Sequence, residues 1–494
     1  MAAATPVSEL LRDLNLGSSV AEFDDALDKY FVETEPFRAL VENRADIIAG
    51  DKGTGKTAIF RILRKRYRGI AELKDVEVIP AFNPKGNPIF QRLVQEQVLT
   101  EAQYVSVWKA YIVSLVGNWL LEIFESSGSA ALLELDTLLR TTGLRSTDDA
   151  PNTIFARIMN TLRKLRPTSA EVQFTLSESG IPIVVPRVEL GAAPDAHKSP
   201  EPLMIRHEDA LALLNRALKD SGVIAWIALD RLDEAFQGFP DIETPALRAL
   251  LRTYLDLLDF EQLRLKLFVR RDLFRRIIQG GFVNLSHINA RKIEIVWDDE
   301  DLLNLLCKRI KDNGALLVAL GLSPTSPNAA VFDAAVPPQI DVGQRKPTSW
   351  NWIVARVRDG NNIKPPRNII DLVAKAREAQ LRKEEREPRD WETSIPLIDA
   401  ESMRRGLAKL SEQRVEDTLL AEAGDAAPMI ERFRGGKSEH NDASLTEVLG
   451  VAEEELPAVV KPLVDLGFLE QVKNTYKVPL LYRGGLGITK GKAF

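Results

Sequence analysis

A glycine-rich segment near the start of the chain has the residue types needed to hold a phosphate group. Its pattern is Gly50-x-x-x-x-Gly55-Lys56-Thr57. Glycines let successive amides turn inward around an anion, a lysine brings positive charge to the outer phosphates, and a threonine hydroxyl can ligate Mg²⁺. The spacing therefore predicts a loop that binds a nucleoside triphosphate with Mg²⁺. The residues expected to contact the nucleotide are Gly50, Asp51, Lys52, Gly53, Thr54, Gly55, Lys56, Thr57 and Ala58.

The segments on either side of this loop favour the same interpretation over a chance glycine turn. Residues 45–49 form an apolar run typical of a buried strand, and residues 57–67 have apolar residues at helical spacing. A helix that begins at the end of the loop points its positive dipole end at the bound anion. Strand, loop and helix in this order are the context that a phosphate-binding loop requires.

A cluster of acidic residues follows a second apolar run. Residues 222–229 are almost continuously apolar, which is typical of a parallel strand covered on both faces, and they lead into Asp230-Arg-Leu-Asp233-Glu234. Open α/β sheets bind ligands at the carboxyl ends of their strands. Asp230 is therefore expected to hold Mg²⁺, directly or through water, and Asp233 or Glu234 to deprotonate the attacking water. A solvated acidic turn is the alternative.

Arginines follow a further predicted strand, residues 264–269. Arg270 and Arg271 are placed either to reach a γ-phosphate or to pair with the acidic cluster, and the sequence leaves both open. Arg275 and Arg276 on the next helix are candidates for a finger that reaches a neighbouring subunit, with solvated surface as the alternative.

Arg367 lies in the first turn of a helix whose start is set by two prolines. A cation there opposes the helix dipole, so it needs a local reason to be present. Phosphate sensing from a helical lid is one such reason.

Length and composition limit the classes of protein to which this chain can belong. A chain of 494 residues predicts two to four domains, and 45% hydrophobic with 28% charged residues is typical of a globular protein. The net charge of −6 limits nucleic-acid contacts to local basic patches. The single cysteine, Cys307, excludes internal disulfides and a Cys-based zinc site. The start of the chain lacks signal-peptide features, and residues 111–124 are too short to span a bilayer, so a cytoplasmic protein without membrane contact is expected.

The order of the predicted elements indicates an α/β fold, with a P-loop NTPase core around a five-stranded mainly parallel sheet, a helical lid and a C-terminal winged helix. The expected strands are residues 45–49, 76–80, 222–229, 264–269 and 292–297. The expected domains are a helical N-terminal segment (1–44), the core (45–82 and 206–298), an accessory insertion with helices and a hairpin at 170–176 and 181–185 (83–205), the lid (299–380), a helical linker (381–442) and the winged helix (443–494).

Two surfaces offer partner contacts. The winged-helix pattern consists of two helices, residues 444–451 and 453–466, followed by a strand pair, residues 467–472 and 476–482. Its second helix begins with Glu453, Glu454 and Glu455, which would repel phosphates where such helices contact bases. This favours a protein contact or a packing role. Contact with a DNA backbone stays open for two basic groups, although an exposed solvated face is preferred for the first. These groups are Arg61, Arg64, Lys65, Arg66 and Arg68 on the loop's helix, and Lys473, Lys477, Arg483, Lys490 and Lys492 in the wing and tail.

Residues about 20–380 and 443–488 resemble the AAA+/STAND side of the P-loop ATPases, close to the origin-recognition-like and KAP-like bacterial ATPases. The resemblance makes Gly50–Thr57 the Walker A motif and Asp230–Glu234 a STAND-type Walker B motif. It makes Arg270 or Arg271 the first sensor and Arg367 the second. The acidic motif is Asp-x-x-Asp-Glu where the family has adjacent Asp-Glu, so the identity of the base stays open.

The resemblance implies a switch or motor that binds and hydrolyses ATP with Mg²⁺ and couples its state to a protein or nucleic-acid partner. ATP-dependent assembly of a homo-oligomer is part of that expectation. Two alternatives remain, a DNA-binding ATPase in DNA transactions or phage defence and a P-loop kinase of a small molecule.

Overall fold

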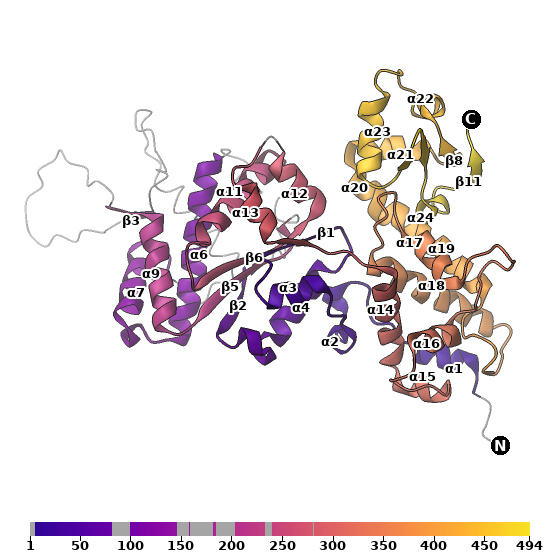
Figure 1. Ribbon diagram of the computed structural model, residues 1–494, viewed down its shortest axis with the longest axis horizontal. Coiled ribbons are helices and arrows are strands. Elements are labelled where there is room, and N and C mark those ends of the chain that lie inside the picture. The colour runs from indigo at the N-terminus through magenta and orange to yellow at the C-terminus, as the bar shows by residue number, and fades with distance from the viewer. Residues whose placement is uncertain are drawn as a thin grey trace, which may run out of the picture. The chain divides into compact units, whose positions relative to one another are not determined.

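The computed structural model describes residues 5–81, 99–145, 158, 181–183, 203–232, 240–279 and 281–494 (Figure 1). The described parts of the chain form two compact units, each with its own hydrophobic core. Unit 1 draws on Met1–Thr34, Asp51–Gly55 and Val296–Phe494. Unit 2 draws on Glu35–Gly50 and Lys56–Ile295.

Unit 2 is built around a five-stranded sheet in which every pair of neighbouring strands is parallel. Its strands are β1 (Ile47–Gly50), β2 (Val76–Ala81), β5 (Ile224–Leu229), β6 (Leu263–Arg270) and β7 (Lys292–Glu294). The spatial order is β2-β5-β6-β1-β7. All five strands predicted from the sequence are confirmed. The sheet is parallel throughout, and β7 ends three residues earlier than predicted.

Helices cover both faces of this sheet, as Figure 1 shows. On one face lie α3 (Glu35–Val41) and α4 (Lys56–Arg66), and the ring of Phe60 in α4 packs edge-on against Phe268 in β6 at 5.6 Å. On the other face lie α6 (Glu101–Ile123), α9 (His207–Asp220), α11 (Pro240–Leu257), α12 (Arg271–Ile278) and α13 (Leu285–Ala290). This double coverage explains the continuous apolar run of β5, because every side chain from Ala225 to Leu229 is at most 1% exposed.

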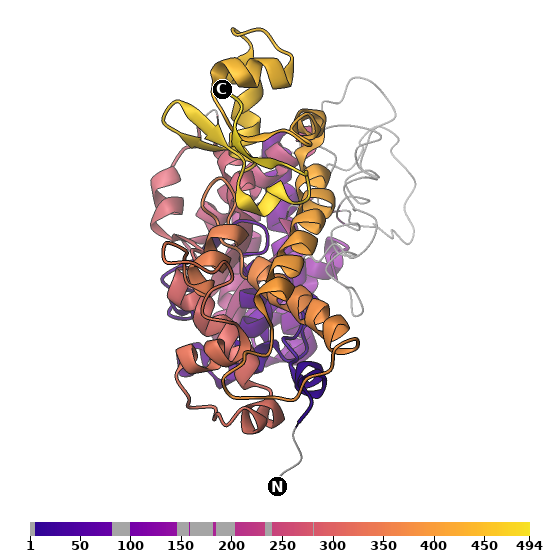
Figure 2. The same ribbon diagram turned by 90° about the vertical axis from the view of Figure 1, so that its right-hand side faces the viewer.

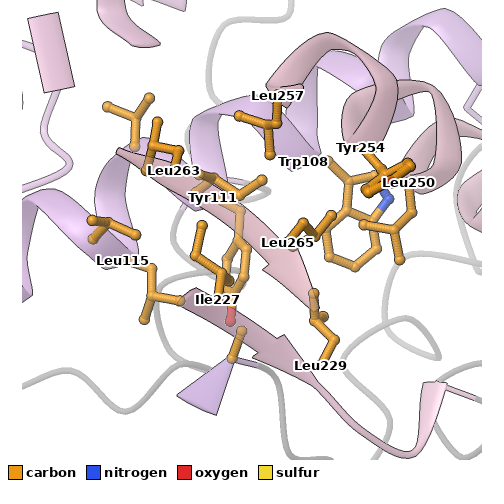
Figure 3. Close-up of a cluster of buried hydrophobic side chains, with 14 of the residues drawn as sticks. Trp108, Tyr111, Leu115, Ile227, Leu229, Leu250, Tyr254, Leu257, Leu263 and Leu265 are labelled. Carbon is orange, nitrogen blue, oxygen red and sulfur yellow. The ribbon is translucent and has the colours of Figure 1, made fainter. Parts of the chain in front are cut away.

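The core on the second face is shown in Figure 3. Trp108 and Tyr111 of α6 pack between Ile227 of β5, Leu265 of β6 and Leu250 of α11. The Trp108 indole donates a hydrogen bond of 2.9 Å to the carbonyl of Ala246. The sequence predicts that α6 belongs to an accessory insertion. In the structure, α6 packs directly on the sheet and covers part of one face.

The remainder of that segment is described only in part. Helix α7 (Ala130–Thr141) packs on α9. Strand β3 (Ile181–Ile183) pairs in antiparallel register with β4 (Leu203–Ile205). The predicted partner strand of β3, residues 170–176, lies outside the described residues.

A buried ionic cluster anchors the strand that leads into the glycine loop. Asp46, which is fully buried just before β1, accepts hydrogen bonds from Lys266 of β6 at 2.7 Å and from Tyr254 of α11 at 3.1 Å. The guanidinium of Arg291, next to β7, also pairs with this carboxylate. Strands β6 and β7 flank β1, so one carboxylate links the amino ends of β1 and β7 to the middle of β6. Burial and pairing of these charges make the loss of any one of them costly, on the order of 3–5 kcal/mol.

His207, at the start of α9, makes the folding of unit 2 sensitive to acid. Its side chain is 3% exposed, and both ring nitrogens are buried without a hydrogen-bond partner in the described part of the chain. Burial and the nearby charge of Lys109 lower the pKa of His207 to about 4. In the unfolded chain a histidine has a pKa near 6.5, so between these values only the unfolded state takes up a proton.

Stability from neutral His207 is therefore complete above about pH 6.5 and is lost as the pH falls toward about 4. We expect acidification from pH 7.5 to pH 5 to cost about 2 kcal/mol through this group. His207→Leu should remove that part of the pH dependence. His287→Leu, at an exposed position, serves as the matched control and should keep the wild-type slope. Denaturant unfolding at both pH values measures the difference.

Unit 1 is mainly helical. Its helices are α1 (Val7–Asp13), α2 (Leu27–Tyr30), α14 (Asp299–Lys311), α15 (Gly314–Ala319), α16 (Asn328–Ala335), α17 (Ser349–Val357), α18 (Pro366–Glu384), α19 (Ala400–Arg414), α20 (Ala421–Ala423) and α21 (Ala427–Glu431). Helices α18 and α19 pack along each other, and Gly406 allows the approach, because a Cβ there would lie 2.7 Å from the backbone nitrogen of Ala376. A π-helical stretch, Val415–Leu420, follows α19.

The C-terminal part of unit 1 contains a second sheet (Figure 2, yellow). Its strands are β8 (Lys437–His440), β9 (Glu470–Val472), β10 (Thr475–Lys477) and β11 (Thr489–Lys492), in the order β11-β8-β10-β9. Helices α22 (Asp442–Leu449) and α23 (Leu456–Asp465) connect β8 to β9.

Two sequence predictions about this part are wrong. Residues 476–482 are not one strand, because Pro479, which has no N–H to donate, ends the pairing and α24 (Leu480–Arg483) follows. The helix predicted to begin at Glu453 begins at Leu456, with Pro457 in its first turn, where a missing N–H is tolerated. The three glutamates thus precede α23.

Cys307 is buried in α14, consistent with a packing role. Among the helices of the described residues, none is both long enough and apolar enough to cross a membrane.

Candidate nucleotide-binding site

The glycine loop joins the carboxyl end of β1 to the first turn of α4. Gly53 and Gly55 have φ angles of +77° and +106°, in the left-handed region that favours glycine. The Thr54 hydroxyl donates a hydrogen bond of 2.8 Å to the Asp51 carbonyl, which closes the turn. The Lys56 ammonium donates to the Gly50 carbonyl at 2.9 Å, so the lysine folds back over the loop. The loop thus has the backbone bends and the charge that its sequence predicts.

The parallel register brings the ends of three strands to the same edge of the sheet. Gly50 at the end of β1 is opposite Arg270 at the end of β6, and Leu229 of β5 is opposite Leu267 of β6. Asp230, directly after β5, therefore lies at the edge from which the loop emerges. The Thr57 hydroxyl in α4 is close enough to the Asp230 carboxylate to lower its pKa. The two predicted metal ligands, distant in sequence, therefore lie close together.

Asp230 is 6% exposed. Burial raises the pKa of its carboxyl group to about 6, against the lowering effects of the Thr57 hydrogen bond and the Lys56 charge. A buried carboxylate with a raised pKa has too little positive charge around it. A divalent cation would supply that charge.

The donor set fits Mg²⁺ shared with a nucleotide. A threonine hydroxyl and a carboxylate are hard oxygen ligands, and Mg²⁺ at nucleotide sites is held by one or two protein groups, phosphate oxygens and water. Within the described residues there is no group of three or more His, Cys, Asp or Glu side chains that could hold a metal alone. Thr57 and Asp230 are therefore the residues that would hold the ion beside a bound phosphate.

The arginines after β6 are paired with other carboxylates. Arg270 makes two hydrogen bonds of 3.0 Å to Asp272. Arg271 Nε is 3.1 Å from Glu294 at the end of β7. Pairing with the acidic cluster was the alternative for both arginines, but Asp233 and Glu234, the two candidate bases, lie outside the described residues.

Arg275 and Arg276, the candidate finger residues, are exposed on α12. One of them has a close acidic neighbour, since Arg276 Nη2 lies 3.1 Å from Glu243 Oε2.

Within unit 1, side chains from outside the loop reach residues 51–55, among them Trp297, Arg367 and Glu422. The Trp297 indole donates a hydrogen bond of 2.8 Å to the Thr54 carbonyl. The stem of Arg367 lies against Gly53, because a Cβ at Gly53 would be 3.4 Å from the Cβ of Arg367. The Lys52 ammonium pairs with the carboxylate of Glu422. Arg367 thus lies beside the loop, the position that the predicted role in phosphate sensing requires.

Sequence reasoning missed Trp297 and Glu422. A signal for Trp297 existed, since it is the last residue of a predicted strand, residues 292–297. Its use required the knowledge that β7 is the neighbour of β1, which the sequence does not contain. Nothing in the sequence indicated that Glu422 reaches the loop, because glutamates are common in charged helices.

A five-stranded parallel sheet, a glycine loop between its strand β1 and helix α4, and an aspartate after β5 that contacts the threonine of the loop define a P-loop NTPase core. No model of a protein family matches the chain.

Among the proteins that resemble the chain are one curated relative and two solved structures. The putative transposon gamma-delta 80.3 kDa protein of Escherichia coli is 26% identical over 306 residues, which are 60% of this chain and 39% of the relative. The ORC1 protein of Aeropyrum pernix in complex with DNA is 13% identical, with 95% and 96% of the two chains covered and a TM-score of 0.37. A Walker-type ATPase of Pyrococcus abyssi is 12% identical, with 97% and 100% covered and a TM-score of 0.42.

The chain thus spans well under half the length of the curated relative, and the two structures are distant from it. Activity has to be argued from the residues of the site itself.

Proposed function

We propose that this protein binds ATP with Mg²⁺ at residues 50–58 and hydrolyses it, and that it uses the nucleotide state as a switch. The observation that carries the proposal is that the Thr57 hydroxyl and the Lys56 charge both lie close enough to the buried Asp230 carboxylate to lower its pKa. A solvated acidic turn would not bury a carboxylate to 6% exposure at this position. A chance glycine turn would not bring these three residue types together.

The chain's own residues have separable roles in this proposal. The loop amides and Lys56 hold the phosphates, and Thr57 with Asp230 places the ion. When bound, Mg²⁺ neutralises charge on the phosphate oxygens. Asp233 or Glu234 orients and deprotonates the attacking water, and which of the two does so stays open.

Arg270 and Arg271 would leave their carboxylate partners for a phosphate only if the phosphate competes with Asp272 and Glu294. The bidentate pair of Arg270 with Asp272 is strong enough to make this exchange a cost for Arg270.

Arg367 is proposed as the residue that distinguishes ATP from ADP. Its Nε is buried without a hydrogen-bond partner in the described part of the chain, and its stem contacts the loop at Gly53. A buried guanidinium nitrogen without a partner is a donor available to an oxygen of a ligand. A triphosphate carries more acceptor charge than a diphosphate, so the arginine favours ATP.

Arg367→Ala is therefore expected to weaken ATP binding roughly tenfold while ADP binding changes about twofold or less, in line with one lost charge-assisted hydrogen bond. Arg382→Ala, at an exposed position of the same helix, is the control and should leave both affinities unchanged. Titration with fluorescent analogues of both nucleotides measures the ratio. An equal loss for both nucleotides would show that Arg367 only supports the loop.

We propose that the C-terminal part, with helices α22 and α23 and strands β8–β10, is a winged helix that transmits the nucleotide state to a partner. The glutamates before α23 favour a protein partner over DNA. The lysines of the wing keep a DNA-binding ATPase as the second candidate, although Glu439 lies within 4.0 Å of both Lys477 and Lys492 and offsets part of their charge.

The test of the proposed function is nucleotide binding and phosphate release by the full chain, with and without Mg²⁺. Free phosphate as product supports an ATPase, whereas a phosphorylated small molecule would establish a kinase instead. Hydrolysis stimulated by DNA, and lost as salt is raised, would assign DNA as the partner. Absence of nucleotide binding by the wild-type protein would overturn the proposal.

A further inference from the structure

Trp297 lies next to the glycine loop because of the strand order. Strand β7 runs parallel to β1, and the amide of Ile295, just past β7, donates a hydrogen bond of 2.8 Å to the Ala49 carbonyl. The chain then leaves the sheet beside the loop. Two residues later the Trp297 indole donates its hydrogen bond of 2.8 Å to the Thr54 carbonyl. The indole ring also approaches Gly55, where a Cβ would lie 4.0 Å from the ring atom Cζ2.

This hydrogen bond fixes the orientation of one peptide group in the loop. The Thr54 carbonyl and the Gly55 N–H belong to the same planar trans unit, in which the C=O and N–H bonds point in opposite directions. A carbonyl held toward the indole therefore turns the Gly55 N–H away from it. At Gly55 φ is +106°, a conformation that glycine reaches easily and also leaves easily. An anchor on the Thr54 carbonyl therefore limits a rotation that glycine at position 55 does not oppose.

The rest of the loop does not supply this anchor. The Thr54 hydroxyl bonds to Asp51, which closes the first half of the loop but leaves the carbonyl of Thr54 unconstrained. Rotation of this peptide changes ψ of Thr54 and φ of Gly55, and residue 55, being glycine, has no side chain to resist it by steric clash. Trp297 is the side chain that the described structure shows on this carbonyl.

We propose that Trp297 is a positioning residue, which pre-orients the Gly55 amide to donate to a nucleotide phosphate. The inference rests on the proposed nucleotide binding and adds a residue from outside the loop motif to that site. The ligand class is a nucleoside di- or triphosphate, because loop amides cradle the α- and β-phosphates common to both. Pre-orientation lowers the entropy lost on binding and so raises affinity without a direct contact to the ligand.

Two substitutions of Trp297 separate the effect of its indole N–H donor from the effect of its aromatic ring. Trp297→Phe keeps an aromatic ring but has no N–H, and Trp297→Gln keeps an N–H donor but has no ring. We expect Trp297→Phe to weaken the binding of ADP and ATP equally, roughly fivefold to tenfold, as one net hydrogen bond predicts. At saturating ATP the turnover rate should stay within about twofold of wild type, since the phosphate, once bound, orders the loop itself. Trp297→Gln should bind nucleotide more tightly than Trp297→Phe.

Trp352→Phe is the matched control. It also loses an indole hydrogen bond in unit 1, of 2.9 Å to Asp341, but one that does not reach the loop. We expect Trp352→Phe to keep wild-type nucleotide affinity. Its melting temperature should fall about as much as that of Trp297→Phe. Affinity, KM, kcat and melting temperature are measured for all four proteins.

Three results would overturn the inference. They are wild-type affinity in Trp297→Phe, an equal loss of affinity in Trp352→Phe, and tighter binding by Trp297→Phe than by Trp297→Gln, which would indicate ring packing. In each case the wild-type protein still binds nucleotide, so the proposed function stands. Failure of the wild-type protein to bind would instead overturn the proposed function and this inference together.

Discussion

Lys56→Ala is expected to remove nucleotide binding. The Lys56 ammonium donates a hydrogen bond to the Gly50 carbonyl at 2.9 Å, and its charge lowers the pKa of Asp230. Of the two lysines in the loop, Lys56 is the one that acts on Asp230, whereas Lys52 pairs with Glu422. Truncation of one partner of a hydrogen-bonded charge pair in a partly buried site costs about 2–5 kcal/mol. We expect the affinity for ATP to fall roughly 100-fold or more, with hydrolysis below detection.

The control for this variant is Lys65→Ala. Lys65 is exposed on the same helix, α4, and carries the same charge. If nucleotide binding depended only on the positive charge of the helix, both variants would weaken it to a similar extent. We expect wild-type binding for Lys65→Ala, and melting curves that show both variants folded. Near-normal ATP binding by Lys56→Ala would show that residues 50–58 are not the nucleotide site.

The strands of the core were predictable because buried strands have a mainly apolar local sequence. Residues 222–229 are apolar without interruption, since β5 is covered by helices on both faces, and the same holds in part for β6. The glycine loop was predictable for a different reason. Its residue types have no common alternative use at that spacing between a strand and a helix.

The spatial order of the strands was not predictable, and several features of the site follow from it. Because β6 lies between β5 and β1, Arg270 ends opposite Gly50. Because β7 lies beside β1, Trp297 reaches the loop. The pairing of Asp46 with Lys266 and Arg291 has the same origin, as each of these residues belongs to a different strand or its flank. Local sequence patterns carry no information on such contacts.

The errors at the C-terminal end have local causes. Residues 476–482 have the composition of a strand, but Pro479 interrupts the ladder and a short helix follows. Helix α6 shows the converse. Its apolar character was evident, but the length of the segment around it suggested an accessory role, whereas its two aromatic residues Trp108 and Tyr111 pack on the central strands.

Asp230→Asn is expected to have two opposite effects, one on stability and one on function. The carboxylate is 6% exposed at the end of β5, and its burial raises the pKa to about 6. Because the folded-state pKa lies above that of the unfolded chain, near 3.9, the folded protein is destabilised by the ionised group. This cost is absent below about pH 4, grows as the pH rises, and is complete above about pH 6.

An asparagine of the same shape has no charge to bury and can still accept the hydrogen bond from Thr57. Without Mg²⁺ and nucleotide at pH 7.5, the variant is therefore expected to be more stable than wild type by about 1–3 kcal/mol, and the difference should shrink at pH 5. Denaturant unfolding at both pH values measures it. His207 titrates in both proteins alike, so its contribution cancels in the comparison.

Addition of Mg²⁺ and nucleotide should make the wild-type protein more stable than Asp230→Asn. A ligand that binds only the folded state raises stability by RT ln(1 + [L]/Kd), and the ionised Asp230 is what makes the site tight for the ion. Wild type should gain melting temperature from the Mg²⁺–nucleotide pair, whereas Asp230→Asn should respond to nucleotide equally with Mg²⁺ and with EDTA. A variant that is less stable than wild type without ligand would show that the carboxylate is part of the structural framework. A variant that is more stable and has lost only its Mg²⁺ response would show that this buried charge is retained for the ion, at the expense of the fold.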